Sequence, residues 1–225
     1  MKKHFYPIFA LFLVGVMFSC QSPKSNSTKE EAAGIDSMAP NPFITHMYTA
    51  DPSAHVWADG RLYVYASHDI DPPRGCDLMD RYHVFSTDDM VNWTDHGVVA
   101  SLKDFKWVPY DNGAWAPQCI ERNGKFYMYC PMPGGIGIGV LVADSPYGPF
   151  IDPIGKPLVK NSYADIDPTV LIDDDGQAYM YWGNPDLYYV KLNEDMISCD
   201  GEVVHEQMTH CLLYTSDAAD DRISV

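Results

Sequence analysis

The sequence predicts an all-β protein and, within that class, a β-propeller. Its composition favours strands and turns, since the 225 residues include 15 Tyr, 9 Phe and 5 Trp together with 16 Gly and 17 Pro. A repeat narrows the class, because one pattern of a turn glycine followed by two tyrosines occurs three times. With 46% hydrophobic and 20% charged residues, the chain can bury a large core, which excludes a mainly disordered protein.

Each repeat combines a hairpin turn with a strand that carries two tyrosines. Asp-Gly or Asn-Gly predicts a tight turn because these residue types tolerate positive φ, and tyrosines follow at the third and fifth positions after the glycine. The segments are Trp57–Tyr65, Glu121–Tyr129 and Asp173–Tyr181. Further strand and turn signals follow each one, and we interpret them as the outer strands of the same sheet: Phe85–Asp89 with Gly97, Val142–Pro146 with Gly155, and Leu192–Met196 with Gly201.

The spacing of the repeats favours a propeller over a sandwich. Gly60, Gly124 and Gly176 follow one another at intervals of roughly 50–65 residues, which suits a four-stranded antiparallel sheet with its loops. A sandwich would also contain many short strands, but it would not repeat the same turn and tyrosine pattern. The sequence therefore predicts about three blades.

Equivalent positions in the blades indicate a site. The ninth residue before each turn glycine is Asp51, Trp115 or Asp167. Because the innermost strands of a propeller surround one axis, we expect these three side chains to converge at one end of the channel. If no bulge intervenes, antiparallel pairing places each beside one cross-strand neighbour: His68, Met132 and Asn184, respectively.

Two carboxylates beside an aromatic side chain suit carbohydrate chemistry. An indole face can pack on the C–H surface of a sugar ring, while carboxyl groups bind hydroxyls and transfer protons. In an inverting glycosidase, one carboxylate activates water and a carboxylic acid protonates the leaving oxygen. A further carboxylate can raise the pKa of that acid through like-charge repulsion.

Several linked motifs carry a resemblance to a known family. Tyr48–Ser53, Trp115-Ala116-Pro117, Asp165–Pro168, Asp175-Gly176 and Tyr181-Trp182-Gly183 resemble, in this order, glycoside hydrolase family 43. The family consists of five-bladed propeller enzymes that invert stereochemistry and act on arabinofuranosyl or xylosyl units of hemicellulose. The resemblance implies that Asp51 is the general base, that Asp167 tunes the pKa of the acid, and that Trp115 lines the sugar site.

Other assignments at the site stay open between two interpretations. His68 is a candidate substrate contact, although a histidine bonded to a neighbouring backbone group would fit equally well. Trp115 could also belong to the core between blades. Asp165 competes with Asp167 for its role, but only Asp167 is in register, so we interpret Asp165 as a solvated neighbour.

The family's general acid has no counterpart in this chain. It is a Glu in a Glu-Gly-Pro-like motif at the start of the fourth blade, and Glu202 and Glu206 both precede that register. Residues 212–225 resemble translated adapter DNA, with a native polar tail as the alternative. We therefore interpret residues 41–211 as a partial propeller, and we expect the full-length protein to be a hydrolase and this fragment to be inactive.

The N-terminus predicts export. A basic start, an apolar stretch too short to span a bilayer, and Met17-Phe18-Ser19-Cys20 indicate a lipoprotein signal peptide over residues 1–19, with lipid on Cys20 and a polar linker over residues 20–40. An ordinary signal peptide is the alternative. The prediction is a periplasmic or cell-surface lipoprotein that contacts the membrane only through its anchor. A net charge of −16 argues against a nucleic-acid partner.

The residues indicate neither an organic cofactor nor a metal site. No Cys-x-x-Cys pair occurs, which argues against zinc, and Asp173–Asp175 fit a solvated turn better than a calcium loop. By resemblance, some family members carry Ca²⁺ on the axis, so calcium in the complete protein stays open. We expect the cysteines to be mostly buried thiols, with a disulfide as an alternative.

Three functions remain as alternatives. The leading one is hydrolysis of arabinofuranosyl or xylosyl bonds in oligo- or polysaccharides. The second is a non-catalytic glycan-binding surface lipoprotein that keeps the aromatic platform without the acid. The third is a five-bladed glycosidase of another family, with a nucleophilic Asp and retention of stereochemistry. The sequence does not choose between arabinose and xylose.

Overall fold

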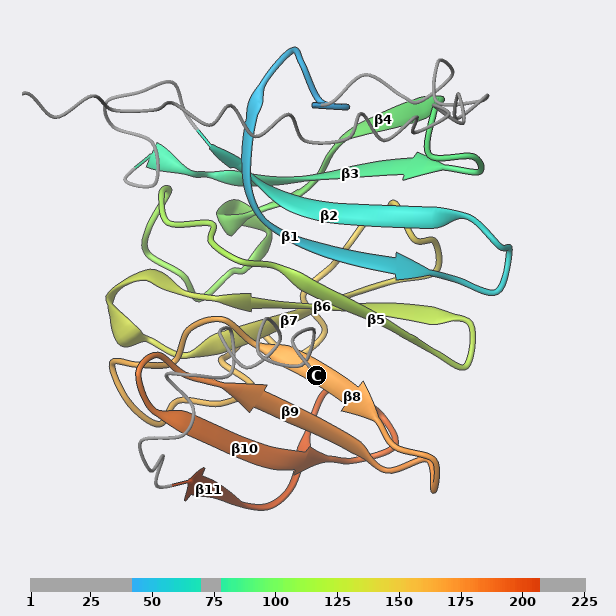
Figure 1. Ribbon diagram of the computed structural model, residues 1–225. Helices are drawn as coiled ribbons and strands as arrows, with labels where there is room; N and C mark the ends of the chain where they lie inside the picture. The colour runs from blue at the N-terminus through green and yellow to red at the C-terminus, as the bar shows by residue number, and fades with distance from the viewer. Residues whose placement is uncertain (1–41, 70–77, 207–225) are drawn as a thin grey trace, which may run out of the picture. The chain divides into compact units, whose positions relative to one another are not determined.

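The computed structural model describes residues 42–69 and 78–206, and within them the chain forms three antiparallel sheets (Figure 1). The predicted signal peptide, the predicted linker, Cys20 and the suspected tail lie outside these residues. The first sheet pairs its strands in chain order. They are β1 (Tyr48–Val56), β2 (Leu62–Asp69), β3 (Arg81–Thr87) and β4 (Trp93–Ser101).

The second and third sheets repeat this meander. The second contains β5 (Gln118–Arg122), β6 (Lys125–Pro131) and β7 (Ile138–Ala143). Two isolated bridges, from β7 to Ile151 and Val159, continue the second sheet beyond its named strands. The third sheet contains β8 (Thr169–Ile172), β9 (Ala178–Trp182), β10 (Leu187–Leu192) and β11 (Cys199–Glu206).

The first strands of the three sheets are neighbours. β1 contacts β5, and β5 contacts β8, although each pair belongs to different sheets. This arrangement of successive meanders is that of propeller blades, whose innermost strands face one axis. The predicted all-β propeller with three repeats is therefore confirmed for the described residues.

The hairpin turns differ between the blades. In the second blade, Asn123-Gly124 is a two-residue turn, since Arg122 pairs directly with Lys125. In the first blade the amide of Gly60 donates to the carbonyl of Trp57, whose own amide donates to the carbonyl of Arg61. Asp173, Gly176 and Gln177 repeat this longer turn in the third blade. The glycine thus closes a longer loop with a bulge in blades one and three, and a two-residue turn only in blade two.

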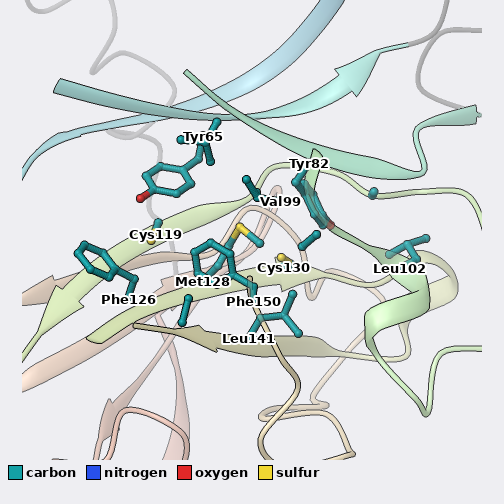
Figure 2. Close-up of a cluster of buried hydrophobic side chains, with 14 of the residues drawn as sticks. Tyr65, Tyr82, Val99, Leu102, Cys119, Phe126, Met128, Cys130, Leu141 and Phe150 are labelled. Atoms are coloured by element: carbon teal, nitrogen blue, oxygen red, sulfur yellow. The ribbon is translucent and has the colours of Figure 1, made fainter. Parts of the chain in front are cut away.

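Alternating side chains of β6 fill two separate cores. Phe126, Met128 and Cys130 point to the core shared with the first sheet, where Figure 2 shows them with Tyr65 and Tyr82. The intervening Tyr127 and Tyr129 enter the core shared with the third sheet. Because successive side chains of a strand point to opposite faces, one strand can hold two neighbouring blades together.

The repeated tyrosines are packing residues in the first two blades. Tyr63 and Tyr65 belong to the first core, and the hydroxyl of Tyr65 donates to the carbonyl of Pro146, 2.6 Å away. In the third blade Met180 and Trp182 take the buried face. Tyr179 and Tyr181 therefore lie on the opposite, partly exposed face, where their ring centroids are 6.4 Å apart.

The described cysteines are thiols. Cys119 and Cys130 are buried in the first core, and Cys199 is partly buried. Burial raises the pKa of the Cys119 thiol to about 12, so that it stays protonated at neutral pH. The prediction of buried thiols is confirmed for Cys119 and Cys130. The remaining cysteines lie outside the described residues: Cys20, Cys76 and Cys211.

Among the described residues, no helix has the length and apolar character needed to cross a bilayer.

Candidate functional site

One backbone feature recurs at the start of the inner strand in all three sheets. Asp51, Ala116 and Asp167 have positive φ values of 50°, 35° and 54°. Such conformations are uncommon for residues other than glycine, and they cluster at functional sites. A proline follows in every case, at Pro52, Pro117 and Pro168. The three Xaa-Pro pairs are therefore the structurally equivalent positions of the blades.

This equivalence corrects the predicted position of Trp115. The ninth residue before the turn glycine is right for Asp51 and Asp167, but the shorter turn at Asn123-Gly124 shifts the second blade by one residue. Ala116 therefore takes the position equivalent to the two aspartates. In the second blade, the position equivalent to Asp51 and Asp167 therefore carries the methyl group of Ala116 and not the indole of Trp115.

The equivalent segments line a common cavity of about 350 Å³. The first blade contributes its strand β1, while the second and third blades contribute the residues at the beginning of β5 and β8. Because these segments lie far apart in sequence, only the propeller brings them together. The lining residues are Asp51, Pro52, Ser53, His55, Ala116, Pro117, Gln118, Asp167, Pro168 and Thr169.

The negative charge of Asp51 acts on the Asp167 carboxyl group in the cavity. The pKa of Asp167 is raised, first by partial burial and then by the negative charge of Asp51, while a hydrogen bond with the Asn184 side chain lowers it. The predicted convergence of Asp51 and Asp167, and the predicted proximity of Asp167 to Asn184, are thus confirmed. The residues that line the cavity include no Lys or Arg to neutralise the pair.

His55 and Gln118 form a polar layer that sequence reasoning missed. The Nε2 atom of His55 lies 3.0 Å from Oγ of Ser53 and 3.4 Å from Nε2 of Gln118. Its ring stacks on Trp57 with centroids 4.8 Å apart, and burial lowers the pKa of His55. The imidazole is therefore held neutral at the cavity wall. Period-two alternation from Asp51 through Ser53 to His55 is the signal that could have found it.

His68 lies outside the set of residues that line the cavity with Asp51. A bulge between Ala50 and Ser53 shifts the pairing of β1 with β2, so that Thr49, and not Asp51, stands opposite His68. The predicted proximity of Asp51 to His68 is therefore wrong. The Nδ1 atom of His68 lies 3.9 Å from Oδ1 of Asp80, and His68 is not among the residues that line the cavity. A substrate contact through His68 stays a prediction without support from this placement.

Trp115 lines a second, smaller cavity of about 60 Å³ beside the first. Its predicted neighbour Met132 also lines this cavity, together with Asp165. The indole packs against the core between the first two sheets. Trp115 therefore contributes to that core, and its predicted contact with sugar stays a prediction.

Asp165 is buried, contrary to its interpretation as a solvated neighbour. Its side chain is 2% exposed, and Oδ1 accepts a hydrogen bond from the indole Nε1 of Trp182 at 2.8 Å. The correction follows from the local fold, since the loop before β8 turns this side chain inward while Asp167 faces the cavity.

Within the described ranges, no group of three His, Cys, Asp or Glu side chains is placed so that it could hold a metal ion. The described residues therefore do not fit a calcium site built from such side chains.

Comparison with known proteins identifies the family. The model of the family described as "Glycosyl hydrolases family 43" matches residues 39–219. The chain belongs to this family. Family 43 membership confirms the resemblance that the motifs at Asp51, Trp115 and Asp167 indicated.

Two curated relatives illustrate the family 43 match. A xylosidase/arabinosidase 43A of Humicola insolens is 47% identical over 155 residues, which cover 63% of this chain and 45% of the relative. An arabinoxylan arabinofuranohydrolase of Bacillus subtilis (strain 168) is 35% identical over 240 residues, covering 85% of this chain and 45% of the relative. The chain thus spans about half the length of these relatives.

Solved structures of family 43 enzymes share the fold. A β-xylosidase/α-arabinofuranosidase from a compost microbial metagenome, solved with xylotriose, has 36% identity and a TM-score of 0.64, with 75% of this chain and 61% of that chain covered. An α-L-arabinofuranosidase of Clostridium thermocellum has 42% identity and a TM-score of 0.60, with 74% and 59% covered.

Proposed function

We propose that the complete protein is an inverting glycoside hydrolase that removes arabinofuranosyl or xylosyl units from plant hemicellulose. The observation that carries the proposal is the pair of carboxylates, Asp51 and Asp167, which come from two different blades to one cavity, where the charge of Asp51 raises the pKa of Asp167. Family relatives named as xylosidases and arabinofuranohydrolases support the substrate class, as does the relative solved with xylotriose.

In the proposed reaction, Asp51 is the general base. Its carboxylate accepts a proton from a water molecule, and the water oxygen forms a bond to the anomeric carbon as the glycosidic C–O bond breaks. The leaving oxygen takes a proton from a carboxylic acid that we assign to no residue of this chain. Asp167 keeps the pKa of that acid high through its negative charge and binds sugar hydroxyls.

The experiment that tests the function is the stereochemistry of the first product. The complete protein is incubated with 4-nitrophenyl α-L-arabinofuranoside and, separately, with 4-nitrophenyl β-D-xyloside, and ¹H NMR follows the anomeric signals before mutarotation. We expect the first sugar released to have the opposite anomeric configuration. Release with retained configuration would contradict the inverting mechanism, and binding of xylo-oligosaccharides without turnover would favour a glycan-binding protein.

We also propose that the protein is exported and lipid-anchored through Cys20. The supporting observation is the basic start, short apolar stretch and Ser19-Cys20 pair, all of which lie outside the described residues. Metabolic labelling with tritiated palmitate in a bacterial host should give a labelled protein, and Cys20→Ala should abolish the label. Equal labelling of both proteins would rule out Cys20 as the attachment point.

A further inference from the structure

We propose that Asp165 is a positioning residue that holds the backbone of Asp167 so that its carboxylate faces the cavity and Asp51. The inference rests on the proposed function only for the role given to Asp167. It adds a residue that does not line the larger cavity, which holds Asp51 and Asp167, and that is outside the register of inner-strand positions.

The buried Asp165 carboxylate joins two separate segments. Its Oδ2 accepts hydrogen bonds from the backbone amides of Asn161 at 2.6 Å and Ser162 at 3.1 Å. Its Oδ1 accepts the bond from the Trp182 indole on β9. A fully buried carboxylate with three donors is the arrangement in which burial of a charge is compensated. It ties the loop before β8 to the end of the neighbouring strand.

Three consecutive residues make three consecutive contacts across this junction. Asp165 bonds Trp182 through side chains, the carbonyl of Ile166 accepts from the amide of Gly183 at 2.9 Å, and the Asp167 side chain bonds that of Asn184. Asp167 is the last of the three, and its backbone has the uncommon φ of 54°. Such a conformation persists only when the surrounding structure fixes it. Asp165 makes the buried one of these three contacts, through its carboxylate.

An amide cannot replace the Asp165 carboxylate here. An ionised carboxylate only accepts hydrogen bonds, whereas Asn has one acceptor oxygen and a donor NH₂ group. In Asp165→Asn, the NH₂ group must face either the indole N–H of Trp182 or the two backbone amides of the loop. One donor-to-donor contact remains when the NH₂ group faces Trp182, and two remain when it faces the loop amides. The segment before Asp167 must therefore shift in either orientation.

Asp195 offers a matched control. Its Oδ1 accepts hydrogen bonds from the backbone amides of Ile197 and Ser198, both at 3.0 Å. This is the same kind of contact that Asp165 makes with its loop. The turn lies between β10 and β11, at the opposite end of the third sheet from Asp167. Asp195→Asn thus disturbs a similar turn of the same sheet without touching the site.

The test measures the Asp167 carboxyl by ¹³C NMR titration of aspartate-labelled complete protein, with the Trp182 indole N–H followed in ¹H–¹⁵N spectra. In Asp165→Asn we expect the pKa of Asp167 to fall toward the ordinary Asp value, since its carboxylate moves away from Asp51 and into solvent. Asp51→Asn, which removes the like charge, gives the reference shift in the same direction. Asp195→Asn should leave the Asp167 titration unchanged.

A residue with only a structural role would give a different result. An Asp165→Asn protein with lower stability but an unchanged Asp167 titration would overturn the proposal. If that variant does not fold, Trp182→Phe removes the indole donor, together with some buried volume of the second core, and should shift the Asp167 titration in the same direction by a smaller amount. An unchanged titration in folded Trp182→Phe would then overturn it.

Activity separates this inference from the proposed function. If the complete protein is a hydrolase, Asp165→Asn should lower kcat by up to about 100-fold, the effect of a misplacement near 1 Å, with little change in KM. A protein without glycosidase turnover whose Asp167 titration still responds to Asp165→Asn would keep the positioning role and refute the function. Normal kcat and an unchanged titration in Asp165→Asn would refute the positioning role alone.

Discussion

Replacing Asp51 by asparagine in the complete protein is expected to lower kcat for aryl arabinofuranosides or xylosides by about 10³-fold, the central range for loss of a general base. Asparagine keeps the size of the side chain and its ability to bind water, but it cannot accept the proton that water must lose. The positive φ of Asp51 is also compatible with Asn, which tolerates this conformation. The loss should therefore be chemical, with the fold retained.

Asp59→Asn is the matched control for Asp51. Asp59 lies in the turn at the other end of β1, where its carboxylate accepts hydrogen bonds from the Arg61 amide and the Tyr63 hydroxyl. This exposed substitution, at the end of β1 away from the cavity, should change the unfolding free energy by no more than about 0.5 kcal/mol and should leave kcat close to the parent value. Steady-state kinetics at saturating substrate measure both variants. An Asp51→Asn enzyme that keeps more than a tenth of the parent kcat would remove Asp51 as the base.

The fold and the convergence of the two carboxylates could be predicted because a repeated turn and strand place equivalent residues at equivalent positions of the blades. Each blade uses a turn glycine and alternating tyrosines, and equivalent positions of a propeller must face one axis. Asp51 and Asp167 share the same longer turn, so counting back from Gly60 and Gly176 gives matching positions. The structure then brings both side chains to one cavity.

Counting back from the turn glycine gives the wrong residue in the second blade because the turn of that blade is shorter. Asn-Gly makes a two-residue turn, whereas Asp-Gly in the other blades closes a longer loop. A register counted from the glycine does not distinguish the two turn lengths. Aligning the blades on Pro52, Pro117 and Pro168 gives the right register and selects Ala116 in place of Trp115. The proline is the better reference because it lies beside the functional position and not at the far end of the strand.

The direction of side chains in irregular segments could not be predicted from the sequence pattern. The bulge at Asp51 and Pro52 moved His68 out of register. Pro52 is the one residue type there that is compatible with a bulge, but proline fits an edge strand or a strand start equally well. Asp165 and Asp167 have the same spacing as two side chains on one strand face, yet one is buried and the other faces the cavity. The loop bonds at Asn161 and Ser162 decide this difference, and they become visible only when the chain is folded.

Gly183→Ala is expected to cost roughly 3–5 kcal/mol of unfolding free energy, from backbone strain together with overpacking. Gly183 has a φ of 122°, and a Cβ atom there would lie 2.2 Å from the carbonyl oxygen of Asp186. Gly183 cannot move away from Asp186 without disturbing the bond from its amide to the carbonyl of Ile166. The same shift would move Asn184 away from Asp167, so the site should loosen together with the fold.

Gly176→Ala measures the cost of positive φ alone, because the added Cβ atom makes no steric clash there. Gly176 lies in the turn between β8 and β9, at the other end of β9 from Gly183. Its φ is 84°, and a Cβ atom there would meet nothing within 4 Å. Its substitution should cost only about 1–2 kcal/mol, the steric penalty of left-handed backbone for an L-residue. Urea unfolding of both variants, followed by tryptophan fluorescence, gives the comparison. Equal losses would show that the approach of Asp186 to Gly183 is not what requires glycine there. A larger loss at Gly183, accompanied by a higher pKa of Asp167 because the Asn184 bond that lowers it is lost, would show that the same close backbone contact supports both the third blade and the carboxylate pair.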